Sequence, residues 1–402
     1  MTSAPPASQT TLNTTADGAS NSIAAPLDAE DATRRRYSAA AGAREEALCC
    51  PVDYDQTLLE AIPDEVIERD YGCGDPSRYV RANETVLDLG SGGGKICFIA
   101  SQIVGPEGRV IGVDMNDEML ALARESAPIV AKNIGHANVE FRRGRIQDLA
   151  LDVDRLESWL NDHPVQSLQD LTRLEEEKER LCREHPLVAD DSIDLIVSNC
   201  VLNLVRESEK SRLIEEMVRV LKPGGRIAIS DIVSDEIVPE HLKHDAELWS
   251  GCISGAYQEL DFLKCLEAAG FYGIEIDKWE GVPFAVVEGI EFRSVTVTAM
   301  KGRPGPCMEA GHAILYRGPW KQVVDDDGHT LERGVRTAVC AKTFRILSSA
   351  PYAEQTIGIE SASTIPDDER SVFDCNRTEP RHPRETKGAD YRVDKPSSDS
   401  CC

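Results

Sequence analysis

The chain has 402 residues, of which 41% are apolar, enough for one large hydrophobic core and a smaller second one. Acidic residues outnumber basic ones by 70 to 44, and the formal charge of −26 argues against nucleic acid and anionic membranes as partners. The apolar runs are too short to span a bilayer and the N-terminus lacks the pattern of a secretory signal, so we expect a cytoplasmic protein. Its thirteen cysteines should then be thiols rather than disulfide staples.

The first 233 residues contain the clearest structural pattern. Residues 1–33 are rich in Ser, Thr, Ala and Asp with few large apolar side chains, which predicts a disordered tail. From the basic run at 34–36 onward, short apolar runs alternate with helical patterns. We expect strands at 85–90, 109–114, 139–144, 193–199 and 226–233, and helices at 96–104, 117–134 and 209–221. This alternation is typical of an α/β fold with a doubly wound, mostly parallel sheet.

The rest of the chain divides by composition. The first domain, residues 34–237, includes a charged stretch of helical pattern at 151–190 that we interpret as a surface insertion or lid. Residues 238–303 are helical and then β-like, which predicts a small α/β substrate-side domain. Residues 304–360 predict a β-rich C-terminal domain, with β-like runs between 312 and 347. Residues 361–402 are rich in Asp, Glu, Arg, Pro and Ser, which predicts a second disordered tail.

A glycine-rich loop follows the first strand in the sequence "DLGSGGGK", residues 88–95. Gly90, Gly92 and Gly94 let the backbone turn sharply and approach a ligand at a helix N-terminus. Nicotinamide and flavin folds use a similar turn. The acidic Asp88 before the loop and the GxGxG spacing favour S-adenosylmethionine, and Asp114 at the end of the next strand could accept hydrogen bonds from a ribose. We therefore expect a class I (Rossmann-like) methyltransferase with S-adenosylmethionine as its cofactor.

Other residues near the predicted strand ends complete the expected cofactor site. Arg145 stands where many methyltransferases carry an acid after the third strand, so adenine is expected to rest on Ile146. We also assign Tyr71, Met115 and Asn199 to cofactor binding.

A cysteine follows the fourth strand directly, in "SNCVLNLV", residues 198–205. Because ligands of open parallel sheets bind outside the carboxyl ends of the strands, Cys200 should lie beside the glycine loop and Asp114. Cys73 in "DYGCGDP" and Cys252 in "WSGCISGA" stand between small residues, which we interpret as room for a ligand. Any one of these cysteines alone could be a small buried apolar residue. Three that converge would suit a trivalent thiophilic ion.

These segments together resemble a known family. "YGCG", "LDLGSGGGK", "VIGVDM", "VSNCVLNLV", "LKPGG" and "LWSGCISGA" are similar to the arsenite S-adenosylmethionine methyltransferases, and the likeness covers about residues 49–347. It implies catalytic cysteines at 73, 200 and 252, with Cys200 and Cys252 holding arsenic(III) and Cys73 as third thiol and disulfide partner. It further implies a disulfide relay through Cys49 or Cys50, and that residues 238–303 form the arsenic-binding domain.

The resemblance also implies the partners. Arsenite or methylarsenite would be the substrate, and thioredoxin or glutathione would restore the thiols. Two alternatives remain from the residues themselves. One is a class I methyltransferase for a small organic acceptor in which the cysteines are structural. The other is a thiol-rich protein that sequesters arsenite without consuming S-adenosylmethionine.

Overall fold

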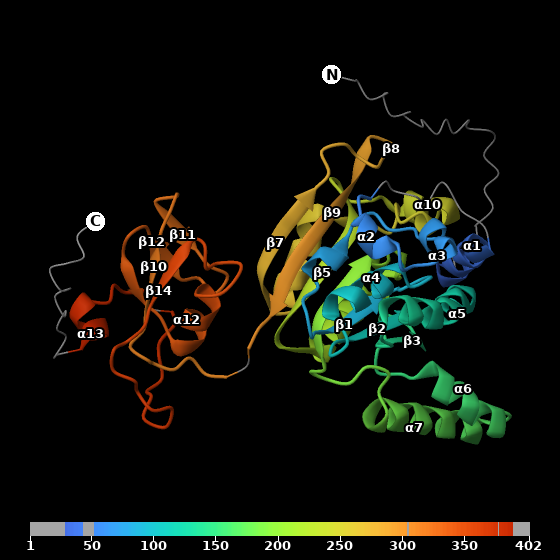
Figure 1. Cartoon of the computed structure of the whole chain (residues 1–402), viewed down its shortest axis with the longest axis horizontal. Coiled ribbons are helices and arrows are strands. Elements are labelled where there is room, and N and C mark those ends of the chain that lie inside the picture. Colours follow the sequence, from blue (N-terminus) through green and yellow to red (C-terminus); the bar gives the residue numbers. More distant parts are fainter. Residues whose placement is uncertain (1–28, 43–51, 304, 377, 389–402) are drawn as a thin grey trace.

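The computed structural model describes residues 29–42, 52–303, 305–376 and 378–388 (Figure 1). Its main sheet has the strand order β3-β2-β1-β4-β5-β9-β7, with β6 paired to β5 and β8 paired to β9. The strands are β1 (Thr85–Leu89), β2 (Arg109–Asp114), β3 (Val139–Arg143), β4 (Ile193–Asn199), β5 (Leu221–Ser234), β6 (Tyr257–Gln258), β7 (Phe271–Trp279), β8 (Ala285–Val287) and β9 (Ile290–Lys301). The first five are mutually parallel, whereas β9 runs antiparallel to β5 and β7.

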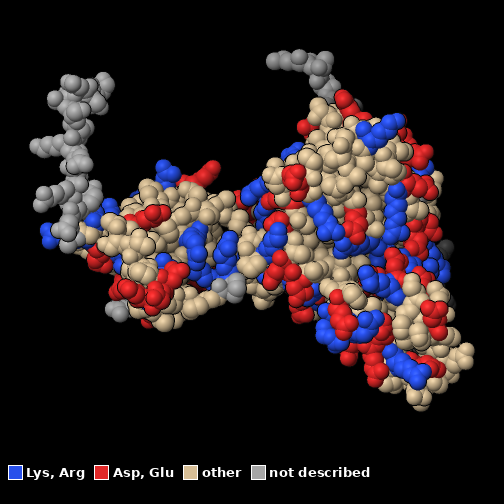
Figure 2. All heavy atoms as spheres, turned by 60° about the horizontal axis from the view of Figure 1, so that its bottom comes forward, with Lys and Arg blue, Asp and Glu red and all other residues tan. Residues whose placement is uncertain are grey.

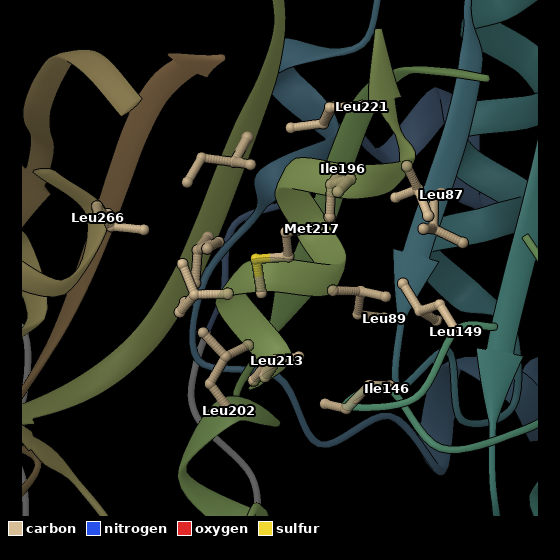
Figure 3. Close-up of a cluster of buried hydrophobic side chains, with 14 of the residues drawn as sticks. Leu87, Leu89, Ile146, Leu149, Ile196, Leu202, Leu213, Met217, Leu221 and Leu266 are labelled. Atoms are coloured by element: carbon tan, nitrogen blue, oxygen red, sulfur yellow. The ribbon is translucent and has the colours of Figure 1, made fainter. Parts of the chain in front are cut away.

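Helices cover both faces of this sheet, which explains why its central strands are apolar along most of their length. On one face, α4 (Lys95–Val104) and α5 (Asp117–Ile134) pack on alternate strand residues such as Val86 and Leu195. On the other face, α8 (Lys210–Val220) and α11 (Glu259–Ala268) pack on the intervening residues. Figure 3 shows Leu213 and Met217 of α8 beside Leu87, Leu89 and Ile196 of the sheet. The predicted doubly wound α/β fold is confirmed.

Further helices lie before β1 and between β5 and β6. These are α1 (Ala29–Gly42), α2 (Gln56–Leu59), α3 (Asp64–Glu68), α9 (Glu240–Lys243) and α10 (Ala246–Ser250), with 3-10 turns at Pro76–Tyr79, Leu202–Leu204 and Glu207–Glu209. Because α1 begins at Ala29, the predicted disordered tail at 1–33 extends too far. Its first 28 residues lie outside the described part of the chain.

Residues 238–303 do not form the separate substrate-side domain that the sequence analysis predicted. Their two long strands, β7 and β9, extend the main sheet, and β9 pairs with β5 from Arg226 to Ser234. Without β9, the side of β5 that faces away from β4 would have unpaired backbone donors and acceptors. Pairing with β9 satisfies them, so this segment belongs to the main sheet. The alternating sequence of β9 identified a strand but not the strand it would pair with.

The C-terminal domain forms a separate lobe near β7 (Figure 1). It contains β10 (Ala313–Tyr316), β11 (Gln322–Val324), β12 (Thr330–Glu332), β13 (Arg336–Ala338), α12 (Ala341–Leu347), β14 (Thr356–Ile359) and α13 (Pro383–Lys387). Two features differ from the prediction. The run "AKTFRIL" is a helix, begun by Cys340, whose sulfur accepts a hydrogen bond from the Thr343 amide. The predicted disordered tail is also wrong for residues 361–376 and 378–388, which belong to this domain.

The segment after 361 is ordered by polar contacts rather than by apolar burial, which is why its composition predicted disorder. Arg381 pairs with Glu309 at 2.7 Å, and the Ala338 amide donates to the Glu379 carbonyl. Residues 389–402, including Cys401 and Cys402, lie outside the described residues. Nowhere in the described part of the chain is a helix both long enough and apolar enough to cross a membrane. Acidic and basic side chains are interspersed over the face shown in Figure 2.

The charged insertion between β3 and β4 forms two helices that extend away from the sheet (Figure 1). α6 (Val153–Asp162) has no buried residue, and α7 (Leu168–Glu184) buries only Leu181. The chain enters and leaves the insertion at one place, since the Leu187 amide donates to Ala150 and the Val188 amide to Leu149. The insertion is therefore a surface excursion closed by backbone hydrogen bonds.

Replacing residues 153–184 with a short Gly/Ser linker should leave the fold intact, with a melting temperature within about 3 °C of the full chain. Most of what it removes is solvated, and the Arg143 pairs with Asp154 and Glu157 lie at the surface. As a contrast, Leu187→Ala should cost about 2–4 kcal/mol, because Leu187 is buried in the main core. Thermal and urea unfolding followed by circular dichroism measure both effects. A large loss on deletion with little effect of Leu187→Ala would show that the core includes the insertion.

Candidate active site

A pocket lies at the carboxyl ends of β1, β2 and β4, where the strand order reverses direction between β1 and β4. In an open α/β sheet this switch point is where ligands bind. Its lining includes the glycine loop, Asp114, Ile146 and Cys200. The residues that we assigned from strand ends are therefore brought together. No residue of the insertion lines this pocket, so the lid interpretation of 151–190 has no support here.

The three predicted glycines have different neighbours. All have positive φ, at 72° for Gly90, 50° for Gly92 and 91° for Gly94. A Cβ on Gly90 would collide with Val201 and one on Gly94 with Phe141, so these glycines permit close packing of the loop. A Cβ on Gly92 would meet nothing within 4 Å, and Gly92 lines the pocket. Gly92 thus leaves open space where the backbone can approach a ligand.

Asp114 fixes the shape of this loop. Its two carboxylate oxygens accept hydrogen bonds from the amides of Gly92 and Asn116, each at 2.8 Å. Burial raises the pKa of Asp114, while these amide donors oppose the rise. A carboxylate has about four acceptor positions, so two remain for hydroxyl groups of a ligand.

A second acidic group lies deeper, at the end of β1. Asp88 is 2% exposed and accepts a hydrogen bond from the Cys97 thiol at 3.2 Å. Burial raises the pKa of Asp88 to about 7, and the charges of Asp70 and Asp114 act in the same direction. Asp70, which also lines the pocket, pairs with the buried Lys95. Charged side chains of both signs line the pocket, since the guanidinium groups of Arg34, Arg69 and Arg206 accompany these carboxylates.

The other residues assigned to cofactor binding divide into two groups. Met115 and Ile146 line the pocket and contribute apolar side chains to it. Tyr71 also lines it, but its hydroxyl donates to the Ala40 carbonyl at 2.9 Å and thereby anchors α1. Asn199 binds the loop around Cys73. Its Oδ1 accepts from the amides of Cys73 at 2.9 Å and Gly74 at 3.1 Å, and its Nδ2 donates to the Gly74 carbonyl at 2.7 Å.

Helix α1 supplies a wall that sequence reasoning missed. Thr33, Arg34 and Tyr37 line the pocket. The helix is held by Asn116, which donates to the Ser38 hydroxyl at 3.0 Å, and by Arg36, which donates to Ser250 at 3.1 Å. The predicted first domain already began at residue 34, but the sequence analysis predicted neither a helix over Ala29–Gly42 nor its position beside the pocket.

Three cysteines converge beside the pocket. Cys73 and Cys200 form a disulfide with Cα atoms 5.9 Å apart, and the Cys252 thiol donates to the Cys200 carbonyl at 3.0 Å. Each is 4% exposed. The hydroxyl oxygen of Tyr37, on α1, lies 3.8 Å from the Cys252 sulfur. Cys200 and Cys252 have φ of 58° and 62°, a conformation that costs free energy in a non-glycine residue and is concentrated at functional sites.

The small residues beside these cysteines have a different role from the one we expected. A Cβ on Gly72 would overlap the Asn199 side chain, and one on Gly255 would overlap the Asn203 backbone. A Cβ on Gly74 would come 2.5 Å from the Ser230 hydroxyl. The glycines therefore let protein segments pack against one another rather than admit a ligand. Cys49 and Cys50, assigned to a disulfide relay, lie outside the described residues.

Comparison with known proteins adds independent information. A family described as "Methyltransferase domain" matches residues 81–185 and 183–270, and a "Domain of unknown function (DUF8838)" matches 303–391. The chain is 33% identical over 325 residues to an arsenite methyltransferase of Aquipseudomonas alcaligenes, covering 76% of this chain and 83% of that protein. It is 27% identical over 365 residues to an arsenite methyltransferase of Mus musculus, with coverages of 83% and 86%.

Among solved structures, it is similar to an arsenic(III) S-adenosylmethionine methyltransferase from Chlamydomonas reinhardtii. The TM-score is 0.51 at 24% identity, and the match covers 83% of this chain and 100% of that chain. This similarity shows a shared fold.

Removing α1 should weaken S-adenosylmethionine binding by at least about tenfold, because three residues of the pocket wall are lost. The test is calorimetry on chains that begin at residue 29 and at residue 43. The first should bind like the full chain, since the described contacts of the N-terminal region with the pocket begin at Thr33. Equal affinity of both chains would show that the cofactor does not touch α1.

Asp88 should make stability depend on pH. The pKa of its carboxyl is about 7 in the folded chain, against about 3.9 when unfolded. Below about pH 4 the carboxyl is neutral in both the folded and the unfolded chain, and its contribution to stability is complete. As the pH rises through 7, the buried carboxyl must ionise and the folded chain loses this stability. Relative to the natural chain, Asp88→Asn should gain up to about 4 kcal/mol between pH 4 and pH 8. Urea unfolding at both pH values measures this, with the exposed Glu60→Gln as control. Parallel pH profiles for the natural chain and Asp88→Asn would refute it.

Proposed function

The chain belongs to the arsenite methyltransferase family, and we propose that Cys73, Cys200 and Cys252 form its arsenic site. The enzyme transfers methyl groups from S-adenosylmethionine to arsenic(III). The observation that carries the site proposal is the convergence of three buried cysteine sulfurs at the end of β4, next to the glycine loop. Thiolates prefer soft ions, and arsenic(III) accepts three of them.

The pocket fits S-adenosylmethionine by the chemistry of its lining. Gly92 provides open space beside the backbone, Asp114 retains acceptor positions for the ribose hydroxyls, and Met115 and Ile146 offer apolar surface for the adenine. When bound, S-adenosylmethionine supplies an electrophilic methyl group attached to a sulfonium.

The cysteines have two tasks in the reaction. As thiolates, they bind arsenic(III) and leave its lone pair free, so no general base is needed. Gaining a methyl group through that lone pair oxidises arsenic from the trivalent to the pentavalent state. Two thiolates that form a disulfide return two electrons and restore trivalent arsenic. Cys73 and Cys200 are the pair suited to this step because they can form a disulfide, while Cys252 remains a thiol.

The oxidised enzyme must be reduced before another turnover. The Cys73–Cys200 disulfide requires two electrons from an external dithiol or from two thiols, for which thioredoxin or glutathione in the cytoplasm is the proposed source. Cys49 or Cys50 could relay these electrons to the buried pair, as the resemblance to the family implies. Arsenite is neutral at pH 7, so the charge of −26 does not repel it.

Cys200→Ser and Cys252→Ser should each abolish arsenite methylation while leaving S-adenosylmethionine affinity within about twofold, because each removes one arsenic ligand and no part of the glycine loop. Cys73→Ser should lose arsenite methylation. With an external dithiol to return the two electrons, it should retain methylation of methylarsenite, which has one fewer site for a thiolate. Cys265→Ser is the matched control, since Cys265 is exposed on α11. Mass spectrometry of the arsenic products and calorimetry of cofactor binding measure the two effects.

The same experiment separates the alternatives. Arsenite turnover retained in Cys200→Ser or Cys252→Ser would show that the replaced cysteine is structural and is not an arsenic ligand. No arsenite turnover by the natural chain would favour a small organic acceptor. Arsenite bound by the natural chain without consumption of S-adenosylmethionine would favour sequestration.

A further inference from the structure

The C-terminal domain contains a second cluster of cysteines, remote from the arsenic site. The sulfur atoms of Cys307, Cys340 and Cys375 all lie within 4.8 Å of one another. Three ligands around a tetrahedral zinc ion with Zn–S bonds of 2.3 Å would have sulfurs about 3.8 Å apart. The cluster is therefore close to the dimensions of a metal site.

The three cysteines come from parts of the domain that are far apart in sequence. Cys307 lies where the chain enters the domain, and its carbonyl accepts from the Phe373 amide at 2.8 Å. Cys340 is buried at the start of α12, and its sulfur accepts from the Thr343 amide at 3.3 Å. Cys375 lies near the end of the described range 305–376. A shared ion would join the first, middle and last segments of the domain.

A histidine in a neighbouring segment has an unused ligand atom. This atom, Nε2 of His329, does not lie within 4.8 Å of all three sulfurs, so the His329 side chain would have to move to complete a four-ligand site. His329 is 1% exposed, and its Nδ1 lies 2.8 Å from the Asp325 carboxylate. Its Nε2 is buried and has no hydrogen-bond partner among the described residues. The next residue, Thr330, donates its amide to the Thr378 hydroxyl at 3.4 Å, so the His329 segment runs beside the Cys375 segment. Zinc-ligating histidines are commonly oriented by a carboxylate on their other nitrogen.

A metal crosslink would add stability to a domain that has a small apolar core. Its apolar core is a single small cluster of Ile314, Tyr316, Leu331, Val339, Phe344 and Leu347. Domains with small cores are often stabilised by disulfides or by a structural metal. A fourth ligand that is a nitrogen favours tetrahedral zinc over arsenic(III), which binds three thiolates.

We propose that Cys307, Cys340 and Cys375, with His329 as the fourth ligand, bind one structural zinc ion in the C-terminal domain. The site is independent of methyl transfer, and it assigns a physical role to a domain whose family description carries no function.

The test is the zinc content of the full chain, measured by inductively coupled plasma mass spectrometry after expression with added zinc and desalting. The natural chain should retain one zinc per molecule. Cys340→Ser and Cys375→Ser should retain less than about a tenth of that, and His329→Gln should lose zinc to a chelator at least tenfold faster. Cys182→Ser, on the insertion helix α7, is the control and should retain one zinc.

Cobalt provides a second measurement that does not depend on variants folding. The chain loaded with Co²⁺ should show thiolate-to-cobalt charge-transfer bands and the intense visible bands of tetrahedral cobalt, and both should disappear when zinc is added. Absence of zinc and of these bands in the natural chain would overturn the proposal. So would full zinc retention in Cys307→Ser/Cys340→Ser/Cys375→Ser. Uptake of one arsenite but no zinc by a chain lacking Cys73, Cys200 and Cys252 would assign the cluster to arsenic instead.

Discussion

The side-chain amide of Asn199 connects the two halves of the candidate active site. It extends from the last residue of β4 and forms three hydrogen bonds with the backbone of the loop that carries Cys73. The loop can approach so closely only because residue 72 has no side chain. Cys200, the next residue along the chain, is then placed against Cys73. A strand end that belongs to the cofactor pocket thereby also determines where the thiols meet.

The second constraint is the closure of the pocket by α1. The sheet supplies the floor through the ends of β1, β2 and β4, but the opposite wall comes from a helix far earlier in the chain. Tyr37 of this helix faces Cys252, and Arg36 contacts α10 next to that cysteine. The wall of the cofactor pocket and the surroundings of the Cys252 thiol are thus built from one element. The three cysteines beside this wall are each 4% exposed, so the proposed arsenic site would be shielded from bulk water, which strengthens electrostatic interactions inside.

Much of this could be predicted from the sequence because the signals are local. Alternating strand and helix patterns, the glycine loop and Asp114 at a strand end specify the fold and the position of the pocket. Residues that act through tertiary contacts could not be predicted in this way. The docking of α1 depends on Asn116 and Tyr71, which lie far from it in the chain. The helix at Ala341–Leu347 has a strand-like composition, and polar contacts rather than apolar burial order the segment around Arg381.

The junction of the insertion with the domain has a consequence for how the chain can be rearranged. Leu149 and Ala150 on one side pair with Val188 and Leu187 on the other, so the two ends of the excursion are held together even if the loop between them is cut. Exposed loops with this property accept new chain termini and inserted domains. The turn between α6 and α7 is therefore a suitable place to open the chain for circular permutation or to carry a fluorescent reporter, at a distance from both the cofactor pocket and the cysteines.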